Sequence, residues 1–499
     1  MPAPRPPDLR LPALRLRAAL VALAAALAAP GPAAAAPAAL PLEDCRLEHP
    51  AGLGSLAARC GTLTVAEDPA APGGRSIALR VAVIRALDRH RTREPLFIVA
   101  GGPGQAATDF YASYASAFAP AQRSHDVVLL DQRGTGGSNR LQCDFPPDFE
   151  VATPAPARIR ELSAACRRGL AGRPQFYTTS VAVQDLDAVR AALGAERISL
   201  YGISYGTRVV QHYLRRYPGR VRAVVLDGVL PPDASLLADT PQNAERALEL
   251  AFARCRADQA CEHAFPELAS RFAALRAELG RRPRRLTLPD PSSGAPRTLE
   301  FDASALAGAV RLLNYHGSTT ALLPLLLDRA ARGDDAPLAA QLLLLGAHLD
   351  AQLAYGMNAA VSCTEDAPAA GSIDRARLAA TYLGSQQLDG LAALCEGWPA
   401  GVVDPDLHAP LATAVPALLL SGEADPVTPP AYAARAAEGF SDRLHVVVRG
   451  QGHGQFMVGC APRLIARFLE AGTARGLDAR CLESAAAPPF VIDLAGPAP

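Results

Sequence analysis

The chain of 499 residues contains no lysine, so all 49 of its basic side chains are arginines. This absence excludes chemistries that need a lysine amine: the P-loop of nucleotide-binding proteins, the Schiff base of pyridoxal phosphate enzymes and a Ser-Lys dyad. The 49 acidic residues balance the arginines, and the net charge is zero. A neutral chain gives no electrostatic reason to expect a nucleic acid as partner.

Long apolar runs are also missing. The run at residues 18–29 is too short for a comfortable membrane span, and no later run reaches its length, so we expect no stable membrane insertion. Arginines precede this run and small residues follow it in GPAAAAPAA, which is the composition of an export signal. We therefore predict a signal peptide over residues 1–36 and a periplasmic or secreted protein.

Closely spaced cysteines of the CxxC type are absent, which argues against metal ligation, and the sequence implies no metal or other cofactor. The ten cysteines fit an exported chain with disulfides, although sequence alone does not fix their connectivity. We predict that each cysteine bonds to its neighbour along the chain: Cys45 with Cys60, Cys143 with Cys166, Cys255 with Cys261, Cys363 with Cys395, and Cys460 with Cys481.

Short apolar runs bounded by turn residues predict eight strands. They cover residues 62–66, 77–86, 96–100, 127–131, 198–202, 223–227, 416–422 and 444–448. The first two can form an antiparallel hairpin, whereas the later ones are apolar on both faces, as in a buried parallel sheet. Helical patterns lie between them, over residues 205–219 and over 180–194, where Ser180 is the expected cap. The alternation predicts an α/β fold with a doubly wound, mostly parallel sheet of eight strands.

The alternation stops between residue 229 and about residue 405. Most of this block has helical patterns, and its Arg/Pro/Ser-rich part, 281–297, is expected to be an exposed connection. We interpret the block as an insertion that lies over the sheet. The predicted domains are a first core part (37–235), a helical cap (236–405) between the sixth and seventh strands, and a C-terminal core part (406–499). The Ala/Pro-rich tail after Cys481 is expected to be ordered only in part.

A serine stands between two glycines in LYGISYGT, residues 200–207, where a predicted strand ends and a predicted helix begins. This context is typical of a nucleophile elbow. Gly202 and Gly206 allow the strand and the helix to pass without a Cβ clash, and the sharp turn pushes the Ser204 hydroxyl above the edge of the sheet. The alternative is a serine that caps an ordinary strand–helix loop.

A serine hydroxyl is a poor nucleophile and needs a base. Among the ten histidines, His453 alone lies in a glycine-rich loop, GQGHGQF, just beyond the last predicted strand. The acid should follow a strand end, and Asp425 in SGEADPVTPP fits best. Glu423 is the local alternative and Asp227 the distant one. Asp131 precedes the serine, and we interpret it as a structural residue that holds the following glycine-rich loop.

Acyl transfer also needs donors for the developing oxyanion. The glycines of VAGGPGQ, residues 99–105, allow backbone N–H groups to face the site. We predict the N–H groups of Gly102 and Tyr205 as the two donors. A phosphate-binding loop is the alternative, but the stretch has no GxGxxG pattern and the chain has no lysine.

Four motifs now stand in order: GGPG (101–104), DQRGTGGS (131–138), YGISYGT (201–207), and GEADPVTPP (422–430) with GQGHG (450–454). This set resembles the tripeptidyl-aminopeptidase-like and proline-iminopeptidase-like α/β-hydrolases. The resemblance implies a serine exopeptidase that removes short N-terminal pieces from peptides, with a helical cap inserted before the acid. It also implies that Ser204 is the nucleophile, Asp425 the acid and His453 the base.

The chain departs from the family pattern at Ala100, where many members have histidine, and at Ile203, where many have glycine. Both positions lie beside the expected acyl pocket and bear on substrate size. Exopeptidases of this kind hold the ammonium group of the substrate with carboxylates of the cap. Glu365 and Asp366 in SCTED are the predicted pair, although two adjacent acids in a loop can also be merely solvated.

Two further functions remain open. A secreted carboxylesterase of the same fold would use the same chemistry on small esters. A non-catalytic binding protein of the hydrolase fold is the third hypothesis, against which the intact set of motifs argues. The sequence does not indicate an oligomeric state.

Overall fold

The computed structural model describes residues 1–2, 39–89, 94–145, 154–236, 238–291 and 293–497. The predicted signal peptide, apart from its first two residues, lies outside the described residues. The chain from Ala39 onward forms one compact unit. Within the described part of the chain, no helix is both long and apolar enough to span a membrane.

A nine-stranded sheet is the centre of this unit, with the order β1-β2-β3-β5-β4-β6-β7-β10-β11. Its strands are β1 (Glu43–Glu48), β2 (Ser55–Ala66), β3 (Ser76–Ile84), β4 (Leu96–Val99), β5 (Val127–Leu130), β6 (Ile198–Ile203), β7 (Val221–Asp227), β10 (Ala417–Gly422) and β11 (Arg443–Val448). All neighbours from β5 to β11 are parallel, and the pairs at the β1 edge are antiparallel.

The predicted count of eight strands is wrong by one, because β1 was missed. Its sequence, EDCRLE, is mostly polar, and only Leu47 is buried. An edge strand of this kind needs no continuous apolar run, so its composition gives little signal.

Helices cover both faces of the sheet, which confirms the predicted fold class. One apolar cluster joins the sheet to α1 (Ala107–Gln122) and α16 (Ala461–Ala471), and the other joins it to α3 (Thr179–Ala192), α4 (Tyr205–Arg216) and α15 (Pro430–Ala437). In β4, Leu96 and Ile98 belong to the first cluster, and Phe97 and Val99 belong to the second. A strand that is buried on both faces therefore reads as a continuous apolar run.

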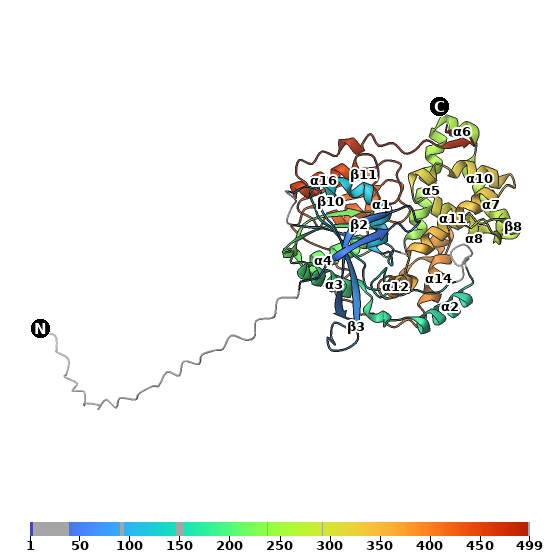
Figure 1. The fold of residues 1–499 in the computed structure, drawn as a ribbon. Coiled ribbons are helices and arrows are strands. Elements are labelled where there is room, and N and C mark those ends of the chain that lie inside the picture. Colours follow the sequence, from blue (N-terminus) through green and yellow to red (C-terminus); the bar gives the residue numbers. More distant parts are fainter. Residues whose placement is uncertain (3–38, 90–93, 146–153, 237, 292, 498–499) are drawn as a thin grey trace. The chain divides into compact units, whose positions relative to one another are not determined.

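The insertion between β7 and β10 has its own apolar core, built mainly by α5, α7, α8, α10 and α11, which group together in Figure 1. Its elements are α5 (Thr240–Ala257), α6 (Gln259–Ala264), α7 (Leu268–Arg281), β8 (Arg284–Pro289), β9 (Pro296–Phe301), α8 (Ala303–Leu313), α9 (Gly317–Thr320), α10 (Leu323–Ala331), α11 (Ala336–Gln352), α12 (Tyr355–Val361), the π-helical turn η3 (Ser362–Asp366), the 3-10 helix η4 (Ala367–Ser372), α13 (Arg375–Ala379) and α14 (Gln386–Cys395). Helix α2 (Pro156–Gly169) belongs to the first core part.

Two local expectations are corrected. The predicted connection at residues 281–297 is largely a hairpin of β8 and β9, since Leu286 and Leu288 alternate with exposed residues and face inward. Ser180 does not cap α3, which starts one residue earlier, and its hydroxyl accepts a bond from the amide of Asp404 instead. In the tail, Phe490 packs in the apolar core of the insertion and is 2 % exposed.

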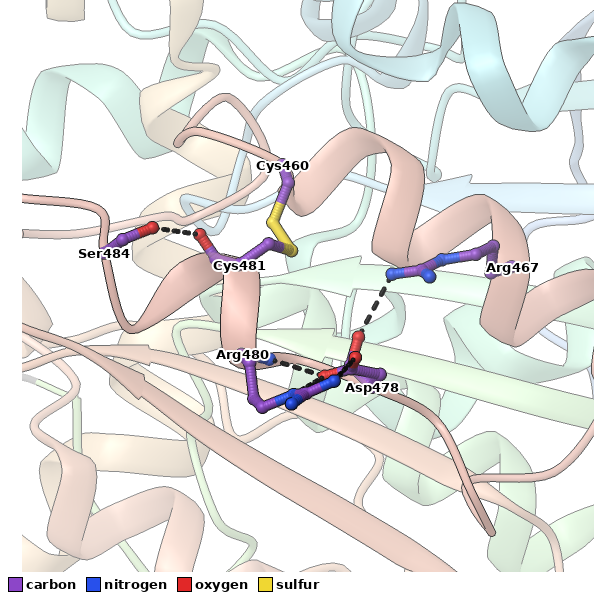
Figure 2. Close-up of a disulfide and its surroundings, with 6 residues drawn as sticks. All are labelled: Cys460, Arg467, Asp478, Arg480, Cys481 and Ser484. Atoms are coloured by element: carbon purple, nitrogen blue, oxygen red, sulfur yellow. Dashed lines mark hydrogen bonds and ion pairs between the residues drawn. A yellow bond between two sulfur atoms is a disulfide. The ribbon is translucent and has the colours of Figure 1, made fainter.

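All five predicted disulfides are present. Figure 2 shows the last of them, in which Cys460 at the start of α16 bonds to Cys481 in the 3-10 turn η5 (Arg480–Leu482). Beside it, Arg467 of α16 donates to the backbone carbonyl of Asp478, whose carboxylate pairs with Arg480. The segment after α16 is therefore held to that helix by a covalent bond and by polar contacts.

Candidate active site

Ser204 occupies the sharp turn between β6 and α4. Its backbone has φ 55° and ψ −126°, a conformation that residues other than glycine rarely adopt. The flanking glycines make this turn possible. A Cβ on Gly202 would lie 2.7 Å from the carbonyl oxygen of Gly206, and a Cβ on Gly206 would collide with the carbonyl oxygen of Val99. The predicted reason for the Gly-x-Ser-x-Gly pattern therefore holds: strand, turn and helix touch backbone to backbone.

Asp425 and His453 come from the two predicted C-terminal motifs, and their side chains meet in the structure. The Nδ1 atom of His453 lies 2.8 Å from Oδ2 of Asp425, across a separation of 28 residues. The other carboxylate oxygen, Oδ1, accepts from the amides of Val427 and Thr428, each at 2.8 Å. The hydroxyl of Thr428 donates to Oδ2 at 2.9 Å. Since Nδ1 faces Asp425, Nε2 is the ring nitrogen left for proton transfer.

Burial and charge act against each other in this pair. Burial disfavours the imidazolium, but the adjacent Asp425 carboxylate outweighs it and holds the pKa of His453 above its ordinary value. Burial likewise opposes ionisation of Asp425, but the charge and hydrogen bond of His453 and the two amides keep the pKa of that carboxyl below its ordinary value. The arrangement is therefore suited to a histidine that becomes positively charged during a reaction.

The insertion holds the histidine loop in place. The amide of His453 donates to the carbonyl oxygen of Tyr315 at 2.6 Å, and the two rings meet edge to face with centroids 5.7 Å apart. Gly452 passes so close to the Tyr315 carbonyl that no Cβ would fit there. The position of the candidate base thus depends on a residue that follows α8 of the insertion.

The two alternative acids have other partners. Asp227 accepts from the amide of Gln455 at 2.8 and 2.9 Å and from the hydroxyl of Tyr201, and burial raises its pKa to about 6. Glu423 accepts from the amide of Gly450 at 2.8 Å. Both carboxylates therefore accept hydrogen bonds from backbone amides at the ends of the histidine loop, and neither bonds to the imidazole.

The GGPG loop lies directly beside the serine. A Cβ on Gly101 would be 3.1 Å from the Cβ of Ser204, and Gly102 has φ +105°. Among the described residues, the amide of Gly102 has no hydrogen-bond acceptor. The amide of Tyr205 belongs to the first turn of α4, where helices leave their N–H groups without intrahelical partners. Asp131 holds the neighbouring loop as expected, since it accepts from the amide of Gly137 at 3.0 Å.

A cavity of about 490 Å³ opens above these groups, and Ser204, Gly102 and His453 all line it. Its volume lies within the range of small-molecule sites. The insertion provides much of the remaining wall, and Asn358 of α12 donates to the carbonyl oxygen of Pro103 at 2.9 Å. Among the described residues, no hydrogen bond joins the hydroxyl of Ser204 to His453. None of the acidic, histidine or cysteine side chains described gather in a group of three or more that could hold a metal ion.

The prediction that Glu365 and Asp366 hold a substrate amine is wrong in this geometry. Both side chains are at most 1 % exposed and neither lines the cavity. They face Arg208 of α4, with nitrogen–oxygen distances of 3.5 and 3.0 Å. Glu365 also accepts a hydrogen bond from the hydroxyl of Thr179. The hydroxyls of Thr179 and Tyr205 are in turn hydrogen-bonded to each other at 2.8 Å. Both carboxylates therefore bind groups inside the protein, and Glu365 is linked through Thr179 to Tyr205, the residue that follows the serine.

Three residues of the site were missed by sequence reasoning. Thr428 has a recognisable signal, because an Asp followed three residues later by Thr is typical of a local turn in which the side chain accepts backbone N–H bonds. Tyr315 and Arg311, which lies on the cavity wall, have no such signal. They reach the site only because the insertion folds back over the sheet.

Comparisons with known proteins agree with this architecture. Carboxylesterase B of Mycobacterium tuberculosis is 30% identical over 415 residues, which cover 74% of this chain and 76% of that protein. Tripeptidyl aminopeptidase of Streptomyces coelicolor is 32% identical over 191 residues, or 35% of each chain. Serine protease Hip1 of Mycobacterium tuberculosis is 32% identical over 209 residues, or 38% of this chain and 39% of that protein. The chain thus spans about a third of the length of the tripeptidyl aminopeptidase that it matches.

The family described as the alpha/beta hydrolase fold matches residues 94–459. This range begins just before β4 and ends just after the loop that contains His453. Because the match covers well over half of the chain, the protein belongs to the alpha/beta hydrolase fold family.

Proposed function

We propose that the protein is a serine hydrolase that works through an acyl-enzyme, with Ser204 as nucleophile, His453 as general base and Asp425 as the acid of the triad. One observation carries this proposal. A serine held at positive φ and an imidazole bonded to a buried carboxylate line the same cavity. This combination is typical of nucleophilic catalysis by a Ser-His-Asp triad on this fold.

The reaction follows from the geometry. Ser204 Oγ attacks the substrate carbonyl while Nε2 of His453 takes its proton, and Asp425 stabilises the imidazolium. The amides of Gly102 and Tyr205 stabilise the oxyanion. The tetrahedral intermediate then expels the leaving group, which receives the proton from His453, and water hydrolyses the acyl-enzyme by the same steps. The hydrogen bond between Ser204 and His453 forms when the substrate binds, since catalytic contacts in an empty site are often long.

For the substrate, we propose short peptides that bind in the cavity under the insertion, so that the protein acts as an exopeptidase. The names of two relatives, a tripeptidyl aminopeptidase and a serine protease, support this class. A second candidate is a carboxylesterase of small esters. It is favoured because no carboxylate occurs among the described residues that line the cavity, and because a relative matched over 74% of the chain is named a carboxylesterase.

We also propose that the protein works outside the cytoplasm, in a periplasm or beyond the cell. The five disulfides support this location, because disulfides persist in oxidising compartments.

The direct test is the Ser204→Ala variant, assayed on peptidyl anilides with free and blocked amines and on short acyl esters. We expect kcat/KM to fall by at least about 10⁴-fold, because the nucleophile is lost. A fluorophosphonate probe should label the wild-type protein and not the variant. Ser199→Ala is the matched control: this serine lies on the same strand, and its buried hydroxyl has no hydrogen-bond partner in the described part of the chain.

Activity of Ser204→Ala near the wild-type rate would refute the assignment. Absence of labelling in the wild-type protein would favour a non-catalytic binding function. Within the panel, peptide cleavage that is unchanged when the amine is blocked would remove the aminopeptidase class and leave the esterase or another peptidase.

A further inference from the structure

The cavity above Ser204 has a positive fixed charge. Arg311 is the only arginine, and no aspartate or glutamate is found, among the described residues that line it. Arg311 lies in the last turn of α8, and no carboxylate of the described residues lies within ion-pair distance of its guanidinium. A guanidinium without a protein counterion is unusual in a partly buried site, because charged groups are costly to remove from water unless they are paired.

The guanidinium is held close to the candidate base. One of its terminal nitrogens donates to the hydroxyl of Tyr315 at 3.2 Å, and its central carbon lies 5.6 Å from the centre of that ring. The ring of Tyr315 lies 5.7 Å from the ring of His453. The guanidinium carbon is therefore separated from the imidazole centre by no more than the sum of these two distances. About three residues of extended chain, at about 3.3 Å each, cover that span.

The donors of Arg311 are incompletely used. Its Nε is buried and has no hydrogen-bond partner among the described residues. Guanidinium has five N–H groups in a planar fork that matches a carboxylate, and a bidentate pair is both stronger and more specific than a neutral contact. By contrast, the described residues of the wall offer nothing anionic to an ammonium group, since Glu365 and Asp366 are paired with Arg208 inside the protein.

We propose that Arg311 binds a carboxylate of the substrate, within about three residues of the carbonyl that Ser204 attacks. This inference rests on the proposed function and deepens it. The carboxylate can come from the free C-terminus of a short peptide or from the acyl part of a half-ester of a dicarboxylic acid. In both cases the substrate is selected by its negative charge, and a free N-terminal ammonium group is not the recognised feature.

The test uses two pairs of substrates that differ in this charge. The ester pair is the mono-4-nitrophenyl ester of glutaric acid and 4-nitrophenyl pentanoate. The peptide pair is trialanine with a free C-terminus and trialanine amide. We expect wild-type kcat/KM to favour the carboxylate in at least one pair by about ten- to a hundredfold, mainly through KM. The pair that shows the preference identifies the source of the carboxylate.

Variants assign the effect to Arg311. Arg311→Gln should bring the ratio within the preferred pair close to one, and Arg311→Lys should retain part of the preference, because an ammonium keeps the charge but loses the bidentate fork. Arg281→Gln is the matched control, since Arg281 is exposed at the end of α7 and does not line the cavity. It should leave the ratio unchanged. Equal kcat/KM within both pairs, or an unchanged ratio in Arg311→Gln, would overturn the inference.

A binding measurement separates this inference from the chemistry. The same four compounds are titrated calorimetrically into Ser204→Ala and into the Ser204→Ala/Arg311→Gln double variant. Tighter binding of the carboxylates that is lost in the double variant supports the role of Arg311 even if Ser204 proves not to be the nucleophile. Equal affinities in the two variants contradict it even if Ser204→Ala abolishes turnover.

Discussion

Four hydrogen-bond donors converge on the carboxylate of Asp425: the amides of Val427 and Thr428, the hydroxyl of Thr428 and Nδ1 of His453. Each of them favours the ionised form, which is why a completely buried carboxyl keeps a pKa below its ordinary value. The charge that is retained in this way then raises the pKa of His453. At the scale of the residue, the strength of the candidate base is set by the turn that follows the acid.

The Asp425→Asn variant tests this coupling. Without the carboxylate, burial becomes the dominant influence on His453, so its pKa should fall. The base must be neutral to accept a proton, so activity is lost as the pH drops below its pKa. We therefore expect the acidic limb of kcat/KM to lie above the ordinary pKa of histidine in the wild type and to move to lower pH in the variant, with kcat reduced by about 10⁴-fold.

Glu423→Gln is the control for this experiment. Glu423 lies two residues from Asp425, but it accepts a hydrogen bond from the backbone N–H of Gly450, and the side-chain oxygen of a glutamine can accept the same bond. Its acidic limb should coincide with that of the wild type. An Asp425→Asn profile with an unshifted acidic limb would contradict the assigned role of the carboxylate.

At the scale of the element, the serine depends on how closely β4, β6 and α4 approach one another. A Cβ on Gly206 would meet the carbonyl oxygens of Val99 and Ala100, which are backbone atoms that cannot rotate away. The glycine is therefore required by packing between two strands and a helix, in addition to the turn itself. The same contact holds the end of β4, and hence the GGPG loop, against the start of α4.

Gly206→Ala should consequently lower both stability and activity. We expect the free energy of unfolding to fall by about 1–3 kcal/mol, as for other overpacked cores, and kcat/KM to fall because the turn and the GGPG loop must move apart. Urea unfolding and steady-state kinetics measure the two effects. Gly219→Ala is the control, since a Cβ there meets nothing within 4 Å. Equal unfolding midpoints for the two variants would show that the contact is not tight in solution.

At the scale of the whole molecule, a buried cluster of charges joins the insertion to the sheet core. Arg208 of α4 donates to Asp366 of η3 and to the carbonyl oxygen of Ala234, and Glu365 completes the cluster. Asp366 also accepts from the amide of Leu236. These contacts link α4, the helix that follows the serine, to the start of the insertion and to η3 in its second half. The insertion is therefore anchored to the element next to the candidate nucleophile.

Arg208→Met should destabilise the protein strongly, because it leaves two carboxylates buried without a counterion. We expect a loss of about 3–5 kcal/mol in the free energy of unfolding, measured in urea. The triple variant Arg208→Met/Glu365→Gln/Asp366→Asn also removes the two carboxylate charges, so its free energy of unfolding should fall clearly less than that of Arg208→Met. Arg216 lies on the same helix and pairs with Asp404 and Asp406, but these side chains are partly exposed. Arg216→Met should therefore lower the free energy of unfolding by less than about 1 kcal/mol. A triple variant as unstable as the single one would argue against the charge as the cause.

Local sequence specifies those parts of the protein whose structure depends on neighbouring residues. Strands buried on both faces, the Gly-x-Ser-x-Gly turn and the glycine-rich loop around His453 are specified within a few residues, because backbone sterics and apolar periodicity act locally. The order of these motifs along the chain then placed serine, acid and histidine at the ends of parallel strands. The polar edge strand β1 was not determined in this way, since an edge that is half exposed has no strong apolar pattern.

Which charged side chains meet follows from the packing of distant segments in the folded protein. Glu365 lies 157 residues from Arg208, and no local pattern shows whether such a carboxylate faces a substrate or a buried arginine. Likewise, Arg311 and Tyr315 reach the cavity because the segment after α8 contacts the loop that contains His453, which is far away in the sequence. Long-range electrostatic partners depend on the packing of segments far apart in the chain, and local propensity carries no information about that packing.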